Sequence, residues 1–254
     1  INIINIDKLT YAANHETFNN FKKNKNYKFF KGDYGNRDLL KKIFANYSIE
    51  KIINFAAETH VDNSISGPIK FIKTNVFSFS IFLNFSLSYF NLLSKSEKKL
   101  FKFIHVSTDE VYGSLRKKEK GFNENNKFYP NSPYSSSKAA SDGIARAWCK
   151  TYGLPVIVTN CSNNYGKYQN KEKLIPLVIN QALQEKIIPV YGNGKNVRDW
   201  LHVSDHCSAL LTIAKKGIAG EAYNIGGGME IENIKIVKLI CSHLDQKSPL
   251  KDGT

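Results

Sequence analysis

A chain of 254 residues, 42% of them hydrophobic, is long enough for one large or two smaller globular domains with a sizeable core. The net charge of +14 suits an anionic ligand, but the lysines are spread along the chain among many Asn and Ile residues. This pattern argues against nucleic-acid binding as the main function. The four cysteines show no CxxC spacing, which argues against a metal site and favours reduced thiols in a cytoplasmic protein.

The two ends of the chain and one apolar segment also bear on its class. The chain begins with Ile1 rather than Met and ends without a finished element, so we interpret it as truncated at both ends. Residues 75–93 carry no charge but contain many Asn and Ser residues. This composition favours a buried or interface helix over a membrane span, and we expect no membrane partner.

The first two predicted strands each end in an acid. Residues 1–7 predict a short strand ending in Asp7, the position at which a dinucleotide-binding unit holds the adenosine ribose. No Gly-rich turn precedes Asp7, which a first βα unit outside the chain would explain; an Asp that only caps a turn is the alternative. Residues 27–33 predict a second strand. Asp33 at its end either meets an adenine amino group or, as we favour from the sequence alone, caps the helix expected at 37–47.

The third predicted strand, residues 51–57, ends in Ala56 and Ala57, whose small side chains let a bulky ligand approach the backbone. A polar loop follows, in which His60 is more readily interpreted as structural than as a catalytic base. Pro68 then precedes a long apolar helix expected at residues 69–93.

The central stretch of the chain runs from Phe103 to Lys138. An apolar run predicts a buried strand that leads into Ser107-Thr108-Asp109-Glu110-Val111-Tyr112-Gly113. Beyond a lysine-rich loop, Tyr134 and Lys138 lie near the start of a helix expected at 133–152. A further strand is expected at 154–160. Strands alternating with helices at this spacing predict a Rossmann-like, doubly wound parallel α/β sheet.

The character of the chain changes after residue 166. We expect helices at 174–184, 204–216 and 234–244, with short strands at 187–191, 198–203 and 222–226. The chain therefore divides into residues 1–166, a dinucleotide-binding domain, and residues 167–254, a smaller α/β substrate domain that is incomplete and partly interleaved with the first.

The central stretch combines two kinds of acid–base chemistry. A Tyr-x-x-x-Lys pair at helical spacing lies on one face, where the ammonium can lower the pKa of the phenol. Such a pair can remove a hydroxyl proton while hydride leaves the same carbon, which needs a nicotinamide acceptor. Thr108 can hydrogen-bond the same hydroxyl. Asp109 and Glu110 add the acid and the base that a β-elimination requires. Each pattern also has an alternative without function. Thr108-Asp109-Glu110 would then be only a turn with a helix cap, and the Tyr/Lys spacing would be a chance occurrence in a lysine-rich chain.

Several segments together resemble the extended short-chain dehydrogenase/reductase superfamily and, within it, the dTDP-glucose 4,6-dehydratases. The segments that carry the resemblance are residues 7–12, 55–64, 107–113, 134–138, 160–166, 172–176 and 198–200. The Thr108-Asp109-Glu110 run and residues 172–176 are the most specific. Sibling epimerases keep the Tyr/Lys pair but usually lack the Asp-Glu pair.

The resemblance implies a hydro-lyase that acts on a nucleotide sugar with bound NAD. Tyr134, assisted by Lys138 and Thr108, would take the C4 hydroxyl proton during oxidation at C4. Glu110 would remove the C5 proton while Asp109 protonates the departing C6 hydroxyl. Return of hydride to C6 would give the 4-keto-6-deoxy sugar.

The resemblance also implies binding residues and a homodimer. Asp7, Asp33, Ala56, Ala57, Tyr134 and Lys138 would contact NAD. The nucleotide sugar would be bound by Asn163, Glu172, Lys173, Arg198 and Asn233, with Arg198 on the diphosphate; for Arg198, a salt bridge with Asp199 is the alternative. Dimers in the family form through the long helix and the Tyr/Lys helix.

Two features leave other functions open. Ser78 replaces a glycine that is usual in the family, and the family's Gly-rich turn lies outside the chain, so the chain alone is not expected to hold NAD firmly. A UDP-sugar 4-epimerase or decarboxylase is the nearest rival function. A noncatalytic nucleotide-binding protein is a more distant one. The nucleotide base is not determined by the sequence.

Overall fold

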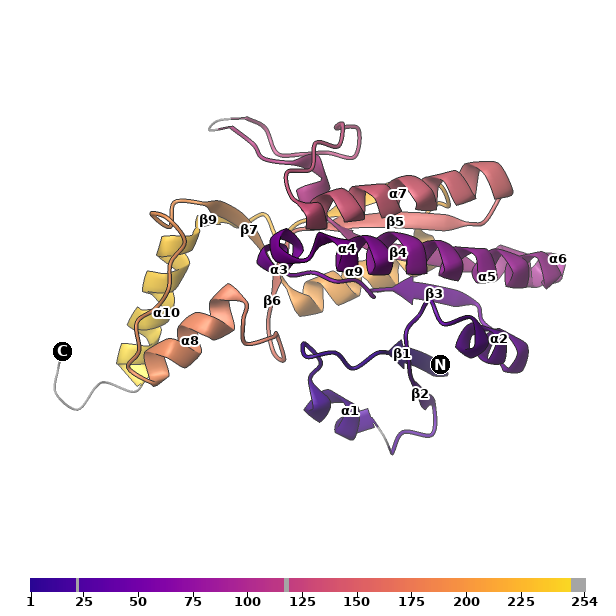
Figure 1. The fold of residues 1–254 in the computed structure, drawn as a ribbon, viewed down its shortest axis with the longest axis horizontal. Coiled ribbons are helices and arrows are strands. Elements are labelled where there is room, and N and C mark those ends of the chain that lie inside the picture. The colour runs from indigo at the N-terminus through magenta and orange to yellow at the C-terminus, as the bar shows by residue number, and fades with distance from the viewer. Residues whose placement is uncertain (22, 117–118, 248–254) are drawn as a thin grey trace. The chain divides into compact units, whose positions relative to one another are not determined.

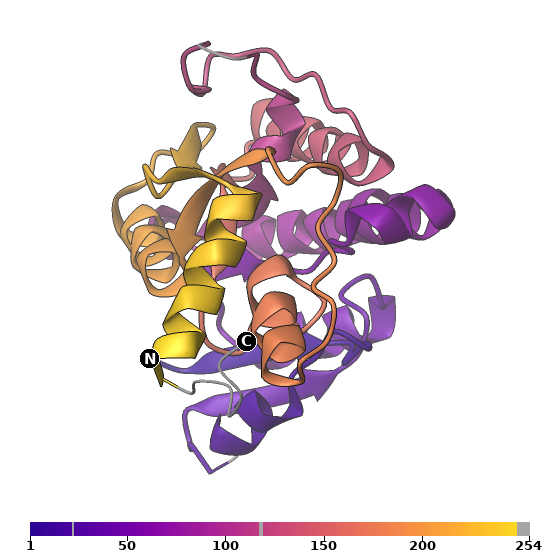
Figure 2. The same cartoon turned by 90° about the vertical axis from the view of Figure 1, so that its left-hand side faces the viewer.

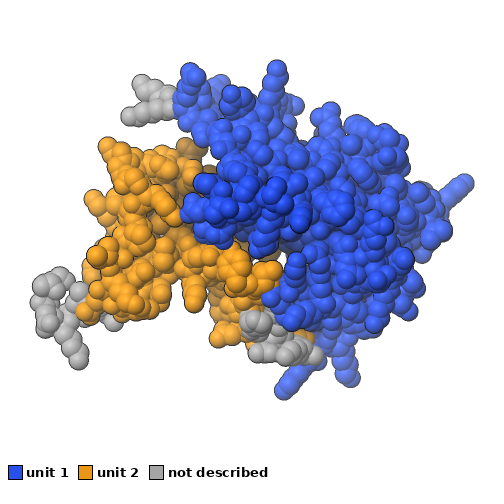
Figure 3. All heavy atoms as spheres, in the orientation of Figure 1, with its two compact units in different colours: residues 1–9, 22–161, 208–225 blue, residues 10–21, 162–207, 226–254 orange. Residues whose placement is uncertain are grey.

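The structure is a computed structural model that describes residues 1–21, 23–116 and 119–247. The chain separates into two compact units (Figure 3). Unit 1 contains residues 1–9, 22–161 and 208–225, and unit 2 contains residues 10–21, 162–207 and 226–254.

Unit 1 is built on parallel strands. β1 (Ile3–Asp7) pairs with β2 (Tyr27–Lys31), and a separate four-stranded sheet has the order β3-β4-β5-β8 (Figure 1). The strands of the larger sheet are β3 (Lys51–Asn54), β4 (Lys102–Thr108), β5 (Val156–Cys161) and β8 (Ala222–Ile225). All neighbouring strands in both sheets run parallel. The predicted Rossmann-like parallel α/β class is therefore confirmed.

Helices connect these strands. They are α2 (Arg37–Asn46), α3 (Val61–Ser66), α4 (Pro68–Phe71), the π-helix η1 (Ile72–Ser78), α5 (Phe79–Leu92), α6 (Lys95–Leu100), the 3-10 helix η2 (Asp109–Tyr112), α7 (Pro133–Tyr152) and α9 (Val203–Lys216), which begins in unit 2. α7 packs on β4 and β5 and lies beside η1 and α5 (Figure 1). The core between these elements is aromatic, and Phe79, Phe101 and Phe103 are almost fully buried in it.

Helix α7 has strong local signals at both ends. Ser132 forms a capping box with Ser135, and Pro133 occupies the first turn, where its missing N–H is not needed. Gly153 ends the helix in the left-handed conformation, with φ 73°. These signals explain why the predicted bounds of α7 agree with the structure.

The long apolar segment expected as one helix at 69–93 contains a π-helical stretch at its centre. Asn75 lies in this stretch and is buried. Its side chain accepts from Glu58 N (2.8 Å) and donates to Glu58 O (3.0 Å) and to Ser137 Oγ (2.9 Å). The wider helical turn thus ties the loop after β3 to α7.

Unit 2 contains α1 (His15–Phe21), β6 (Asn163–Tyr165), α8 (Leu174–Leu183), β7 (Val197–His202), β9 (Glu230–Glu232) and α10 (Asn233–Lys247). Its sheet has the order β6-β7-β9, with β6 parallel and β9 antiparallel to β7. Figure 2 shows α8 and α10 side by side, in agreement with their extensive contacts.

Two predicted strands differ from the structure. Residues 187–191 form no strand: Pro189 offers no N–H to a neighbouring strand, and Ile187 and Tyr191 are exposed. The third strand ends at Asn54 rather than Ala57, so the residues after Asn54 leave the sheet. Among the described residues, no helix has the length and apolar character needed to cross a membrane.

Candidate active site

The Thr-Asp-Glu run lies where β4 leaves the sheet. Thr108 is the N-cap of η2, and its Oγ1 accepts from Glu110 N (3.2 Å) and donates to Asp109 Oδ1 (3.3 Å). Asp109 and Glu110 therefore occupy the first turn of a short helix at the carboxyl end of a buried strand. The segment is a helix cap, and it also presents two carboxylates at the sheet edge where open α/β sheets bind ligands.

Tyr134 and Lys138 lie on α7 and are both buried. Lys138 Nζ donates to Val106 O of β4 (2.9 Å), and the Tyr134 ring packs edge-on against Phe71. Burial lowers the pKa of Lys138, and the Asp142 carboxylate opposes this effect.

The pKa of Tyr134 is raised rather than lowered in the structure. Burial is the largest cause, the charge of Glu110 adds to it, and a hydrogen bond with Thr108 opposes it. The structure thus brings Tyr134 close to Thr108, Asp109 and Glu110, while Lys138 lies one turn further along α7. All five predicted catalytic residues belong to unit 1. The raised pKa keeps the phenol in its neutral form.

The two strand-end acids, Asp7 and Asp33, lie at the ends of the paired strands β1 and β2. Asp7 Oδ1 accepts from Leu9 N (2.7 Å). Asp33 accepts from Gly35 N (2.8 Å) and from Lys8 Nζ (2.9 Å). The expectation that Asp33 caps the following helix is wrong, because α2 begins one turn later and Asn36 is its N-cap.

Ser78, the residue that departs from the resembled family, contacts Asp33. Burial alone would raise the pKa of Asp33, but hydrogen bonds from Gly35, Lys8 and Ser78 and the charge of Lys8 hold it below its usual value. A Cβ on Gly35 would lie 2.6 Å from both Cβ and Oγ of Ser78. The serine therefore fits only because residue 35 is glycine.

Ala56, Ala57 and His60 follow β3. Ala56 N donates to Asn54 Oδ1 (3.2 Å), which fixes the chain as it leaves the strand. His60 is the N-cap of α3 and accepts from Asn63 N at 3.4 Å, in accordance with the structural interpretation of this histidine.

The predicted substrate residues all lie in unit 2. Asn163 begins β6, Asn233 begins α10, and Lys173 is the N-cap of α8. Glu172 Oε1 accepts from Tyr11 Oη (3.4 Å). Arg198 is exposed on β7, while Asp199 accepts from Gly227 N (2.8 Å) and Met229 N (2.7 Å) and so serves to hold a turn.

Sequence reasoning missed three buried polar residues beside the predicted site: Asn75, His105 and Asp142. Each is a polar residue within an otherwise apolar or helical pattern. For Asp142, the signal was available in the sequence, since it follows Lys138 by four residues and therefore shares its helix face.

A parallel sheet with a Tyr-x-x-x-Lys helix beside it and acids at its carboxyl edge defines a Rossmann-like enzyme of the short-chain dehydrogenase/reductase class. The sequence profile described as GDP-mannose 4,6 dehydratase matches residues 1–252, and the chain belongs to this family.

Three known proteins illustrate the similarity. A dTDP-glucose 4,6-dehydratase of Xanthomonas campestris is 51% identical over 253 residues, which are 100% of this chain and 72% of that protein. The crystal structure of dTDP-glucose 4,6-dehydratase from Bacillus anthracis in complex with NAD matches with a TM-score of 0.85 and 45% identity, covering 99% of this chain and 74% of that one. A UDP-glucose 4-epimerase from Thermotoga maritima with UDP-glucose matches with a TM-score of 0.83 but 25% identity, covering 95% and 74%.

Proposed function

We propose that the protein is an NAD-dependent hydro-lyase that converts dTDP-glucose to its 4-keto-6-deoxy derivative. The observation that carries this proposal is the joint presence, at one sheet edge of unit 1, of Tyr134 with Lys138 and of Asp109 with Glu110. The relatives named dTDP-glucose 4,6-dehydratase, at about half identity over the whole chain, support the same reaction.

The side chains of unit 1 fit NAD by their chemistry. Asp7 and Asp33 offer carboxylate oxygens to ribose hydroxyls and an adenine amino group, and Ala56 and Ala57 leave room for the cofactor at the backbone. Lys138 has three N–H donors, of which one goes to Val106 O, so the ammonium can also serve ribose hydroxyls. When bound, NAD supplies a hydride acceptor for the sugar C4 and a hydride donor for C6.

The residues of the chain accept and donate the protons of the reaction. Tyr134, hydrogen-bonded to Thr108 and assisted by Lys138, takes the C4 hydroxyl proton. The resulting C4 ketone acidifies the C5 proton, which Glu110 removes. Asp109 gives its proton to the C6 hydroxyl, which leaves as water, and a proton then returns to C5. The starting and final redox states of the cofactor are the same.

We assign the cofactor mainly to residues 1–166 and the nucleotide sugar mainly to residues 167–254, with Asn163 as a sugar contact from the first range and residues 208–225 contributing to the fold of unit 1. Asn163, Glu172, Lys173 and Asn233 are the proposed sugar and nucleotide contacts. The exposed guanidinium of Arg198 suits two diphosphate oxygens at once.

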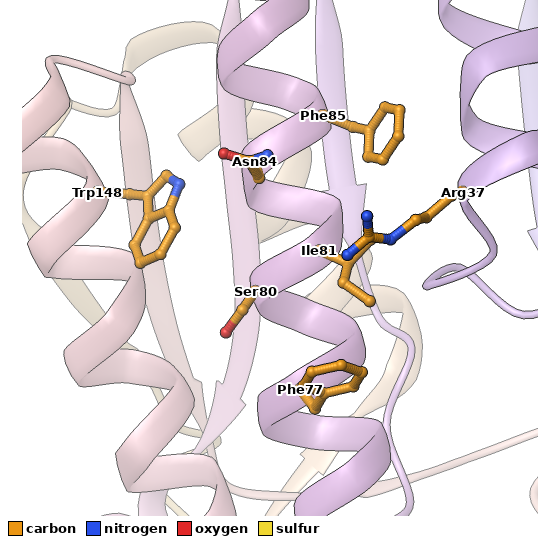
Figure 4. A pocket seen from close by; sticks show the side chains of 7 residues that line it. All are labelled: Arg37, Phe77, Ser80, Ile81, Asn84, Phe85 and Trp148. Carbon is orange, nitrogen blue, oxygen red and sulfur yellow. The ribbon is translucent and has the colours of Figure 1, made fainter.

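We also propose a cytoplasmic homodimer. None of the four cysteines forms a disulfide, as we expect of a reducing compartment. A pocket of about 350 Å³ lies between η1, α5, α2 and α7 (Figure 4). It is lined by Arg37, Phe77, Ser80, Ile81, Asn84, Phe85 and Trp148. Phe77 in this set is largely exposed, which fits a face that a second copy covers.

A product assay tests the function. The protein is loaded with NAD and incubated in parallel with dTDP-, UDP- and GDP-glucose, and products are identified by mass and NMR. We expect a 4-keto-6-deoxy sugar, formed fastest from dTDP-glucose. Interconversion of C4 epimers without loss of water would assign the protein to the epimerases instead, and binding without turnover would assign it to the noncatalytic class.

A further inference from the structure

A cluster of five buried polar side chains lies beneath Tyr134 and Lys138 and takes no part in the proton transfers above. The cluster joins β4, α7 and β5, and each member is at most 3% exposed: His105, Ser107, Ser141, Asp142 and Asn160. Burying polar groups is unfavourable unless they are hydrogen-bonded, and burying a charge requires a partner as well. The charged member of the cluster therefore needs both hydrogen bonds and an opposite charge nearby.

Asp142 is the charged member and contacts all three elements. Its Oδ2 accepts from Ser107 Oγ of β4 (2.9 Å) and from Asn160 Nδ2 of β5 (3.1 Å). Its Oδ1 lies 3.4 Å from His105 Nε2 and has no hydrogen bond within the described part of the chain. Well-formed hydrogen bonds from neutral donors thus reach only one of the two Asp142 oxygens, and the other oxygen faces the His105 ring.

His105 cannot neutralise this carboxylate. Ala56 N donates to Asn54 Oδ1, so the Asn54 amide nitrogen faces His105 Nδ1 (3.3 Å) and donates to it. His105 therefore carries its proton on Nε2, which faces Ser141 Oγ (3.0 Å) and Asp142. Burial and the charge of Lys138 lower the pKa of His105 to about 4, so the ring is neutral at neutral pH.

Lys138 is the cation that matches Asp142. It lies four residues earlier on α7, hence on the same face one turn away, and it is buried to the same extent. A buried ammonium and a buried carboxylate are each costly alone, by several kcal/mol. Placed one turn apart in a dry environment, the two charges stabilise each other even without direct contact.

We propose that Asp142 is a positioning residue for the reaction: its buried carboxylate is the counter-charge of Lys138 and anchors the ends of β4 and β5 to the Tyr/Lys helix. The inference rests on the proposed function, in which Lys138 must remain an ammonium to assist Tyr134. Burial lowers the pKa of Lys138, whereas the charge of Asp142 raises it and so helps to keep the ammonium protonated.

Other ionisable groups near Lys138 come from several elements. Cys161 of β5 also raises the pKa of Lys138, but less than Asp142 does. His105 of β4 is neutral. The two carboxylates of η2, Asp109 and Glu110, act on the neighbouring Tyr134. The charged side chains of α3, α4 and η1 are exposed: Asp62, Lys70 and Lys73. Asp142 is thus the buried carboxylate on which the charge of Lys138 depends.

The decisive variant is Asp142→Asn, which keeps the shape and removes the charge. We expect the alkaline limb of the kcat–pH profile of the NAD-loaded protein to move down by about one unit or more, because Lys138 then loses its proton at lower pH. KM for the sugar nucleotide should change much less than kcat. Asp142→Glu, which keeps the charge, and Ser141→Ala, which removes a neutral hydrogen bond of the same cluster, should retain the wild-type alkaline limb.

A readout that does not depend on turnover accompanies the profile. In protein labelled with ¹³C at lysine Cε, the Lys138 signal is the one absent from Lys138→Met, and it should titrate at lower pH in Asp142→Asn than in wild type. An unchanged titration and an unchanged alkaline limb would overturn the inference, even if the variant melts at a lower temperature. Asp142→Ser is a second neutral variant; if neither neutral variant folds, Asp142 is a core residue and the inference fails. A wild-type protein that makes no 4-keto-6-deoxy sugar would refute the proposed function, while the lysine titration would still test Asp142.

Discussion

At the scale of single residues, the state of Tyr134 differs most from what its spacing suggests. A Tyr/Lys pair on one helix face implies a phenol with a lowered pKa, yet burial and Glu110 raise it. Two carboxylates favour the protonated forms of the pair: Glu110 raises the pKa of Tyr134, and Asp142 raises the pKa of Lys138. In the proposed reaction, Tyr134 therefore depends on nearby positive charge to act as a base, and the Lys138 ammonium provides such a charge.

Glu110→Gln should separate oxidation from elimination. The glutamine keeps the size of the side chain but cannot take the C5 proton, so we expect product formation to fall by roughly 10²- to 10⁴-fold. Oxidation at C4 does not need this base, so substrate should still produce the near-ultraviolet absorbance of reduced nicotinamide. Tyr134→Phe should abolish both signals.

Glu50 is exposed and lies just before β3, so Glu50→Gln serves as the control and should leave both signals intact. Equal turnover of Glu110→Gln and wild type would refute the role assigned to Glu110. Loss of the absorbance signal in Glu110→Gln would instead mean that the residue is required for oxidation.

His105 predicts a pH dependence of stability. Its pKa is about 4 in the fold against an ordinary value of 6.5, so the unfolded chain binds more protons between these values. The neutral ring contributes stability that is fully present above about pH 6.5 and is lost as the pH falls towards 4, by up to about 3 kcal/mol. Urea unfolding at a series of pH values measures this loss.

His105→Gln, which does not titrate, should be less stable at neutral pH but should lose less stability between pH 6.5 and pH 4. Parallel pH curves for variant and wild type would show that His105 is not the group responsible.

At the scale of elements, the short helix η2 depends on a glycine at its end. Gly113 has φ 93°, and a Cβ there would lie inside contact distance of Tyr129 O. Gly113→Ala should destabilise the fold by about 2 kcal/mol or more, because it combines an unfavourable backbone conformation with a steric clash. It should also lower activity, since Asp109 and Glu110 belong to the displaced turn.

Gly143→Ala provides the matched control. Gly143 lies in α7, and a Cβ there would meet nothing within 4 Å, so alanine should stabilise the helix by about 0.5 to 1 kcal/mol. Thermal unfolding of both variants tests the pair. A Gly113→Ala variant as stable as wild type would mean that the turn tolerates a side chain.

At the scale of the whole molecule, the proposed homodimer predicts the effect of a charge on its interface. Phe77→Asp should give a monomer in sedimentation velocity, because the exposed ring on η1 would be replaced by a hydrated carboxylate in the covered face. Leu211→Asp, on α9, changes a residue of similar exposure elsewhere and should leave the association state unchanged. A wild-type monomer, or a Phe77→Asp dimer, would contradict the proposed interface.

The fold was predictable where local signals and tertiary structure agree. β4 is a mostly buried strand with Phe103, Ile104 and Val106 as its apolar residues, and α7 has a capping box at one end and a left-handed glycine at the other. The π-helical stretch was not predictable, because Asn75 depends on Glu58 and Ser137, which are distant in the sequence. The absence of a strand at 187–191 had a local signal in Pro189, which has no N–H to donate to a neighbouring strand.

The candidate site shows the same division. Motif spacing singled out Tyr134, Lys138 and the η2 carboxylates, and in the structure Asp109 and Glu110 act on Tyr134. It did not identify His105 or Asp142, since a buried polar cluster is recognised only when the strands that contribute to it are placed side by side. The catalytic and binding roles of the site residues in both units remain predictions.

The π-helix η1 also limits how this chain can be recombined with its relatives. A π-helix accommodates one residue more than an α-helix of the same length, and here that extra residue lets Asn75 reach the loop before α3 and Ser137 together. A chimera joined within Ile72–Ser78 to a partner with a regular α-helix would turn α5 by about 100° against the preceding segment. Crossover points for domain shuffling should therefore lie outside this stretch, so that the helix and the loop that it holds are inherited together.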